Sequence, residues 1–196
     1  MRKTERLTVQ NLVTTGIFAM LLFLCMFAVI ILLGMNPFTY LAAPCVLGLV
    51  SGLPILLLLY KVPKTGTAFL LIAIQAVFLL LMGRLPVDIL ALFCCAIIAE
   101  ILYGLLGRGT FRAAAAVNMV YACAIMLVTC VGLLIMKDAY LQAFAAYGDA
   151  FLNGINQMVN PVSFMLLMAV AAICGLSGAL LARKVLSKHF HSSSAC

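Results

Sequence analysis

Glu100 is the residue whose type and position first suggest chemistry, because it lies within a long run of apolar and small residues. If that run crosses a bilayer, an ionised acid near its centre costs roughly 2.5–3.5 kcal/mol and needs a partner. A tight basic turn at 107–112 follows and brings Asn118 opposite Glu100. We therefore predict a Glu100–Asn118 hydrogen bond, helped by Arg108, Arg112 or Lys61. The alternative is a proton or cation relay, although a relay normally uses several ionisable groups through the depth of the membrane.

Two more polar groups lie at or within apolar runs. Asp88 follows Pro86 in RLPVD, where a proline suits the first helical position and an acid in the first turn meets the positive end of the helix dipole. Asp88 can also pair with Arg84, and its alternative role is to hold a charged solute. Gln75 lies near the middle of another run, where an unpaired amide is costly. It either bridges two helices or points into an outward-facing cavity.

Several kinds of chemistry are not expected. The apolar runs contain no histidine, and the four acids beyond residue 10 are too scattered to form a catalytic dyad. GLLGRGT at 104–110 lacks the lysine of a phosphate-binding loop. The eight cysteines include no C-x-x-C pair and are expected to be small packing residues. We therefore expect no enzyme, no metal site and no cofactor.

The elements that position these groups are transmembrane helices. Of the 196 residues, 67% are hydrophobic and 9% are charged, and about 20 apolar residues cross the hydrocarbon as a helix. The first run is longer than the apolar core of a signal peptide, so we interpret it as a span, with Thr8 as its N-cap. We predict an all-α integral membrane protein with six transmembrane helices, near 12–33, 40–60, 66–82, 86–106, 113–136 and 161–182.

Basic residues predict the orientation of these helices. Only Arg84 and Lys137 lie on one side of the six-helix arrangement. The other ten lie together on the opposite side: Arg2, Lys3, Arg6, Lys61, Lys64, Arg108, Arg112, Arg183, Lys184 and Lys188. Because basic loops stay in the cytoplasm, both termini are predicted to be cytoplasmic. Residues 1–186 would form one membrane domain, and 187–196 a disordered cytoplasmic tail.

The segment 137–160 is the longest connection between predicted spans. Its larger apolar residues recur at spacings of three and four, which is typical of one helical face: Tyr140, Phe144, Tyr147, Phe151, Ile155 and Met158. We predict an amphipathic helix on the outer face between spans five and six. It either caps the bundle or serves only as a connector.

Small residues mark the helix faces that can approach closely. Gly48 and Gly52 form a G-x-x-x-G in the second span, and Ala171, Gly175 and Ala179 form a stripe of small residues within the sixth. Such stripes serve packing within the bundle or contact with a partner subunit.

Three segments carry a resemblance to a known family: LTVQNLVTTGIFA near the start, LAAPCVLGLVSGLPILLLLYKVPKTGTAFLL at 41–71, and AEILYGLLGRGTFRAAAAVN at 99–118. They resemble the Trep_Strep family, also called MptD, of substrate-binding S components of energy-coupling factor (ECF) transporters. The resemblance implies a six-helix subunit of the bacterial plasma membrane that captures a vitamin-like micronutrient from outside. A transmembrane coupling (T) subunit and two cytoplasmic ATPases would then drive uptake.

By analogy with S components, the solute site is expected in the outer half of the bundle. The groups available there are aromatic rings, amides and one ion pair, which suit a planar, weakly charged solute. The predicted substrate-binding residues are Asn36, Phe38, Tyr40, Gln75, Arg84, Asp88, Tyr147, Asn153, Asn156 and Asn160. Each could alternatively be an interfacial anchor.

The resemblance also implies a docking face on the first helix. S components generally contact the coupling subunit there through small residues, and Thr15, Gly16 and Ala19 are the candidates in this chain. Met20 stands where a second small residue is expected, so the register stays open. The alternative function is a stand-alone ion-coupled carrier, and a membrane scaffold is a third.

Overall fold

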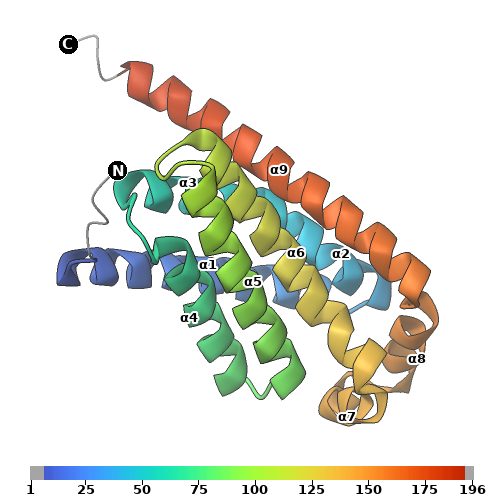
Figure 1. The fold of residues 1–196 in the computed structure, drawn as a ribbon. Coiled ribbons are helices and arrows are strands. Elements are labelled where there is room, and N and C mark those ends of the chain that lie inside the picture. Colours follow the sequence, from blue (N-terminus) through green and yellow to red (C-terminus); the bar gives the residue numbers. More distant parts are fainter. Residues whose placement is uncertain (1–6, 193–196) are drawn as a thin grey trace.

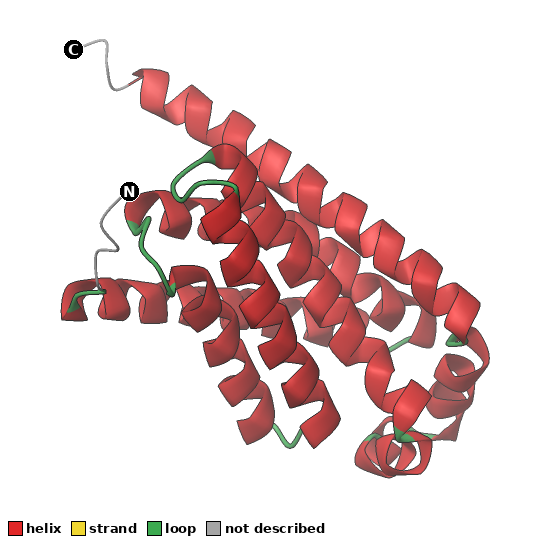
Figure 2. Ribbon diagram, viewed as in Figure 1, coloured by secondary structure: helices red, strands yellow, loops and turns green. Residues whose placement is uncertain are grey.

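The computed structural model describes residues 7–192, which form helices and contain no strand (Figures 1 and 2). The elements in chain order are α1 (Val9–Leu33), α2 (Pro37–Val50), α3 (Gly52–Lys61), α4 (Thr67–Leu81), α5 (Pro86–Leu105), α6 (Phe111–Ile135), α7 (Lys137–Ala143), the 3₁₀ turn η1 (Ala145–Tyr147), α8 (Asp149–Met158) and α9 (Pro161–Ser192).

Local sequence explains where the helices begin. The Thr8 hydroxyl accepts a hydrogen bond from the Asn11 amide, as expected for the N-cap of α1. Prolines occupy the first position of α2, α5 and α9, where a missing N–H costs nothing and the fixed φ suits a helix. The predicted start of a helix at Pro86 is thus confirmed.

Five segments of the described chain are long and apolar enough to span a membrane. In that count α2 and α3 together form one segment, Pro37–Lys61. The predicted third span corresponds to α4, which has only 15 residues. Its length is about 22 Å at 1.5 Å per residue, less than a hydrocarbon core of about 30 Å. Helical segments therefore occur at all six predicted positions, but in the described chain only five of them are long enough to span a membrane.

The segment Pro37–Lys61 is interrupted at Ser51, between α2 and α3. Pro54 has no N–H to donate to the Val50 carbonyl, so the regular helical ladder cannot continue through this turn. The interruption places Ser51 inside the protein, where its side chain is fully buried.

Helix α6 is the centre of the bundle, and α1 lies at its edge. In the most apolar window of each helix, 72% of α6 is buried but only 17% of α1. Much of α1 therefore faces outward.

Glycines let α9 cross α2 and α3 at backbone contact. A Cβ on Gly52 would overlap the carbonyl of Gly178, and a Cβ on Gly178 would overlap the carbonyl of Gly48. A Cβ on Gly48 would lie 3.2 Å from the Gly175 nitrogen. The G-x-x-x-G of the sequence therefore serves packing within the chain.

Asn118 of α6 forms hydrogen bonds with both α2 and α9 at this crossing. Its amide donates to the carbonyls of Gly48 at 3.0 Å and Gly175 at 2.6 Å, and its Oδ1 accepts from the Ser51 hydroxyl at 2.8 Å. The predicted Glu100–Asn118 hydrogen bond is wrong, because Asn118 faces α2 and α9 and its hydrogen-bonding groups are used there.

Asn118→Leu is expected to lower the free energy of unfolding by about 2 kcal/mol, because it removes three interhelical hydrogen bonds and each is worth about 0.6 kcal/mol in a membrane protein. Thermal unfolding of the purified protein in detergent measures the change. Asn153→Leu, at an exposed amide of α8, is the control and should change stability little. Equal effects of the two substitutions would contradict this role for Asn118.

The segment 137–160 is not the single helix that its periodicity predicts. It is broken into α7, η1 and α8, and Gly148 links the last two with a φ of +85° that other residues rarely adopt. Tyr140, Phe151 and Ile155 of the predicted face are nevertheless buried. The segment packs on the bundle at these positions.

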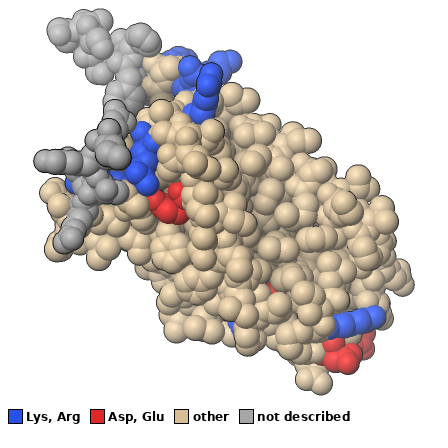
Figure 3. Space-filling view, viewed as in Figure 1, with Lys and Arg blue, Asp and Glu red and all other residues tan. Residues whose placement is uncertain are grey.

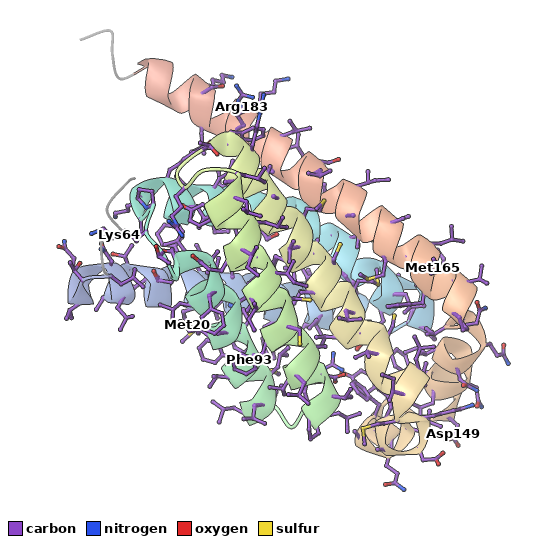
Figure 4. All side chains as sticks on the ribbon, viewed as in Figure 1. Met20, Lys64, Phe93, Asp149, Met165 and Arg183 are labelled. Atoms are coloured by element: carbon purple, nitrogen blue, oxygen red, sulfur yellow. The ribbon has the colours of Figure 1, made fainter. Side chains whose placement is uncertain are left out.

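Charged residues gather at the two ends of the bundle. In Figure 3 the space-filling surface is almost free of charge between a basic end near the end of α9 and a mixed cluster at the opposite end. The labelled residues Arg183 and Lys64 lie toward the first end, and Asp149 toward the second (Figure 4). Helix α9 continues through 187–192 of the predicted tail, whereas 193–196 and the basic residues within 1–6 lie outside the described residues.

Candidate functional site

A cavity of about 190 Å³ opens at the end of the bundle that carries α7 and η1. Its wall comes from four parts of the sequence: the end of α1, the start of α2, the end of α4 with the turn that follows it, and the α7–η1 segment. The lining residues are Ile30, Tyr40, Leu79, Met82, Gly83, Arg84, Leu85, Ala143, Phe144 and Tyr147. A smaller chamber of about 20 Å³, room for about one water, shares Ile30, Tyr40, Leu79 and Arg84 with it and reaches toward α6.

Arg84 is the only charged residue among those that line the cavity. Its Nη2 donates to the Tyr40 hydroxyl at 3.3 Å, and its guanidinium lies 5.0 Å from the centre of the Phe144 ring. Nη1 lies 3.7 Å from Asp88 Oδ2, too far for a hydrogen bond, and has no hydrogen-bond partner. Burial lowers the pKa of Arg84, but Tyr40, Tyr140 and Asp88 outweigh it and raise the pKa above its ordinary value. The cavity wall therefore holds a fixed cation, and its unused Nη1 donor is buried on the side of Asp88.

Aromatic rings form a continuous row beside this cation. Tyr140 stacks on Phe144 at 4.4 Å between centroids, and Phe144 is followed by Tyr147 at 5.7 Å. The row continues from Tyr147 to Phe151 at 4.9 Å. Phe151 in turn meets the edge of Tyr40 at 5.6 Å. Phe144 and Tyr147 of this row line the cavity, and their polarisable faces suit a planar solute or a cation.

Asp88 lies behind the cavity wall. Its side chain is fully buried and neither carboxylate oxygen has a hydrogen-bond partner. A Cβ built on Gly132 of α6 would lie 3.3 Å from Oδ1, so the carboxylate lies against that helix. Asp88 thus balances the charge of Arg84 without itself lining the cavity.

The arrangement is suited to binding. It offers one fixed cation, phenol and aromatic faces, and an apolar floor. No group of three or more metal-ligating side chains occurs in the described part of the chain.

Of the ten residues predicted to bind substrate, Tyr40, Arg84 and Tyr147 line the cavity. Asp88 pairs with Arg84 behind it. The other six lie elsewhere: Asn36, Phe38, Gln75, Asn153, Asn156 and Asn160. Solute binding by any of the ten stays a prediction.

Three of the polar side chains outside the cavity have structural partners. Asn36 accepts from the Phe38 amide and caps α2, and Asn160 accepts from the amides of Val162 and Ser163 and caps α9. Gln75 donates to the Ala19 carbonyl at 2.6 Å, so it bridges α4 and α1 as one of its two predicted alternatives states.

Phe144 lines the cavity beneath Arg84 but is absent from the predicted site. Phe144 belongs to the predicted apolar face of segment 137–160. That spacing was the sequence signal that could have included it in the site. The apolar lining residues Ile30, Leu79 and Met82 carry no sequence signal that separates them from other residues of the bundle.

Glu100 has its partners at the opposite end of the bundle. Its two carboxylate oxygens accept from the backbone amides of Gly66 at 2.8 Å and Phe69 at 3.1 Å. Arg108 lies 3.9 Å away. Gly66, the N-cap residue of α4, has no side chain that could cap the helix. The Glu100 carboxylate of α5 caps it instead, at the N-terminus of α4, where the helix dipole favours an anion.

Glu100→Leu is expected to lower the free energy of unfolding by about 3 kcal/mol, because it leaves two backbone N–H groups without their acceptor. Glu100→Gln keeps one acceptor and should cost about 1 kcal/mol. Thermal unfolding in detergent measures both. If both variants keep the stability of the wild type, the capping role of Glu100 is contradicted and the alternative of a proton or cation relay is favoured.

The predicted docking residues do not share an outward face. Thr15 and Ala19 are fully buried within the bundle, so neither can contact a partner from its present position. Gly16 is open, and a Cβ there would meet nothing within 4 Å. The small residues at 15 and 19 let α1 approach α4, where Gln75 reaches the Ala19 carbonyl.

Comparison with known proteins identifies the family. No curated protein and no solved structure matches the chain. A family model described as "Hypothetical bacterial integral membrane protein (Trep_Strep)" matches residues 9–192, which include every helix from α1 to α9. With its apolar helices, its charged ends and a match over nearly its whole length, the chain belongs to the Trep_Strep family of bacterial integral membrane proteins.

Proposed function

We propose that this protein is the substrate-binding S component of an ECF-type importer, which captures a vitamin-like solute from outside the bacterial cell without catalysing a reaction. The observation that carries the proposal is the cavity around Arg84, at the end of the bundle opposite the basic end. A binding subunit needs a solute-sized recess with few fixed polar groups, and the cavity provides Arg84, Tyr40 and an aromatic row.

The cavity is smaller than most small-molecule sites, which enclose roughly 300–1,000 Å³. A vitamin-sized solute therefore requires the wall to widen. The wall formed by Phe144 and Tyr147 lies between two short elements, α7 and α8. Such a segment can move without disturbing the spanning helices.

The proposed topology has six crossings with both termini in the cytoplasm. In this topology the short helix α4 crosses the membrane. The Glu100 carboxylate satisfies the backbone amides at its N-terminus. The start of α1 and the end of α9 lie toward the same end of the bundle, where most of the described basic residues gather (Figures 1 and 3). That asymmetry supports a cytoplasmic basic end and an outward-facing cavity.

The proposed partners are a transmembrane coupling subunit and two cytoplasmic ATPases. The sequence has no phosphate-binding loop of its own, so energy from ATP would have to come from other chains. Since Thr15 and Ala19 are buried, we assign docking to the outward side of α1 around Gly16. This side includes the exposed residues Val13, Ile17 and Met20.

Proteoliposomes test the assignment against its alternative. Uptake that requires ATP together with a co-purified ATPase pair supports the importer. Uptake by the purified chain alone under a proton or sodium gradient would instead indicate a carrier. Mass spectrometry of the small molecule retained by the purified protein would name the solute.

Asn153→Cys tests the topology. Asn153 is exposed on α8, so a membrane-impermeant maleimide should label this variant in intact cells. The parent protein, with its native cysteines, gives the background. Labelling only after the cells are opened would rule out an outward cavity.

A further inference from the structure

We infer a binding site for an anionic phospholipid in a groove at the basic end of the bundle. The groove lies between α1, α3 and α9 and measures about 610 Å³. Phe18, Leu57, Tyr60, Lys61, Arg183 and Ser187 line it. It is separate from the Arg84 cavity, and the inference does not depend on the proposed function.

The charges of the groove are of one sign. Lys61 and Arg183 are exposed, and no acid lines the groove in the described part of the chain. The two ion pairs found among described residues use Arg84 and Arg108 and involve neither of these cations. A ligand with a negative group therefore complements the groove.

Arg183 is held in place by an aromatic ring. Its guanidinium lies 4.7 Å from the centre of the Phe111 ring at the start of α6, and it also lines a neighbouring groove that contains Arg112. A stacked guanidinium keeps its N–H groups in one plane and can donate two parallel hydrogen bonds to a phosphate. In Figure 4, Arg183 lies near the exposed end of α9.

The groove changes from apolar to polar along its length. Leu57 and Lys61 are one helical turn apart on α3, so the apolar and cationic parts are separated by about 6 Å. Phe18 supplies a second apolar wall from α1. A phospholipid shows the same change over this distance, from acyl chain to phosphate, and basic pockets between transmembrane helices suit anionic headgroups.

The apolar part of the groove favours a lipid over a polypeptide. Phe18 and Leu57 belong to segments long and apolar enough to span the membrane. An occupant at that depth must be soluble in hydrocarbon, and a peptide entering there would have to satisfy every backbone polar group. An acyl chain carries no such requirement.

The absence of tryptophan from the chain permits a direct test. Leu57→Trp places a single tryptophan in the groove, and its fluorescence is followed in vesicles that contain brominated phosphatidylglycerol or brominated phosphatidylcholine. The anionic lipid should quench the fluorescence more strongly than the zwitterionic lipid. Each cation is expected to raise the binding constant for phosphatidylglycerol relative to phosphatidylcholine by about fivefold. Adding Lys61→Gln and Arg183→Gln should abolish the preference.

Ile97→Trp is the matched control, because Ile97 is an exposed residue of α5 that lines neither groove. Its quenching should be equal for the two lipids. Equal quenching of the Leu57→Trp variant by both lipids would overturn the inference, and so would a preference that survives removal of the two charges.

A second measurement avoids a new tryptophan. Phosphatidylglycerol retained per protein is measured by mass spectrometry after detergent extraction, for the wild type and for the variant with both cations replaced. A lower retained amount in the variant is expected. Unchanged retention contradicts the site.

Discussion

Gly52→Ala is expected to lower the free energy of unfolding by about 3 kcal/mol, at the upper end of the usual cost of overpacking. The added methyl group would overlap the carbonyl group of Gly178 and lie 2.9 Å from the Ala179 nitrogen. These are backbone atoms, so no side chain can rotate away and α9 itself has to move. Thermal unfolding in detergent and recovery of monomeric protein after size exclusion measure the loss.

Gly16→Ala is the matched control, because both glycines lie in helices of the same chain. A Cβ at Gly16 meets nothing within 4 Å, so only helix propensity changes. Alanine is better than glycine in a helix by up to about 1 kcal/mol. The control should therefore be neutral or slightly stabilising, and equal losses in the two variants would contradict the contact between α3 and α9.

Helix positions were predictable from the sequence because they depend on local signals. The predicted span 86–106 corresponds to Pro86–Leu105, and 66–82 corresponds to Thr67–Leu81. Apolar run length and terminal Pro, Thr and Asn residues set these limits. Gly148 is an equally local signal, and its position within 137–160 could have indicated the break between η1 and α8.

Partners of buried polar groups were harder to predict. The need for Glu100 to be paired was clear from the sequence, but Asn118 was assigned by counting from the α5–α6 turn. The acceptors are in fact the amides of Gly66 and Phe69. The position of these amides depends on how the connection after α3 places the start of α4. This is a property of the tertiary structure, and it cannot be deduced from residue spacing along α5 and α6.

The candidate cavity was partly predictable. Arg84 and Tyr40 were expected there because they belong to loops at the end of the bundle where the analogy with S components places the solute. Asn36 and Asn160 were assigned to the solute, although each precedes a proline at a helix start, which is the common position of an N-cap. Their capping role was therefore readable in the sequence and accounts for both amides.

Arg84→Gln is expected to reduce the solute retained by the purified protein by about 10- to 100-fold. A hydrogen bond to a charged group is worth about 1.5–3 kcal/mol, and 1.4 kcal/mol corresponds to tenfold in affinity. Arg84 is the one cation among the described residues that line the cavity. Mass spectrometry of the retained molecule measures the effect, with Lys137→Gln, an exposed cation toward the same end, as the control.

The substitution also leaves Asp88 buried without its cation, which can cost about 3–5 kcal/mol in stability. Arg84→Gln combined with Asp88→Asn removes both charges and separates the two effects. If Arg84 contacts the solute, the double variant regains stability but still fails to retain the solute. If the double variant retains the solute as the wild type does, Arg84 serves only to neutralise Asp88, and the solute is held by the aromatic row alone.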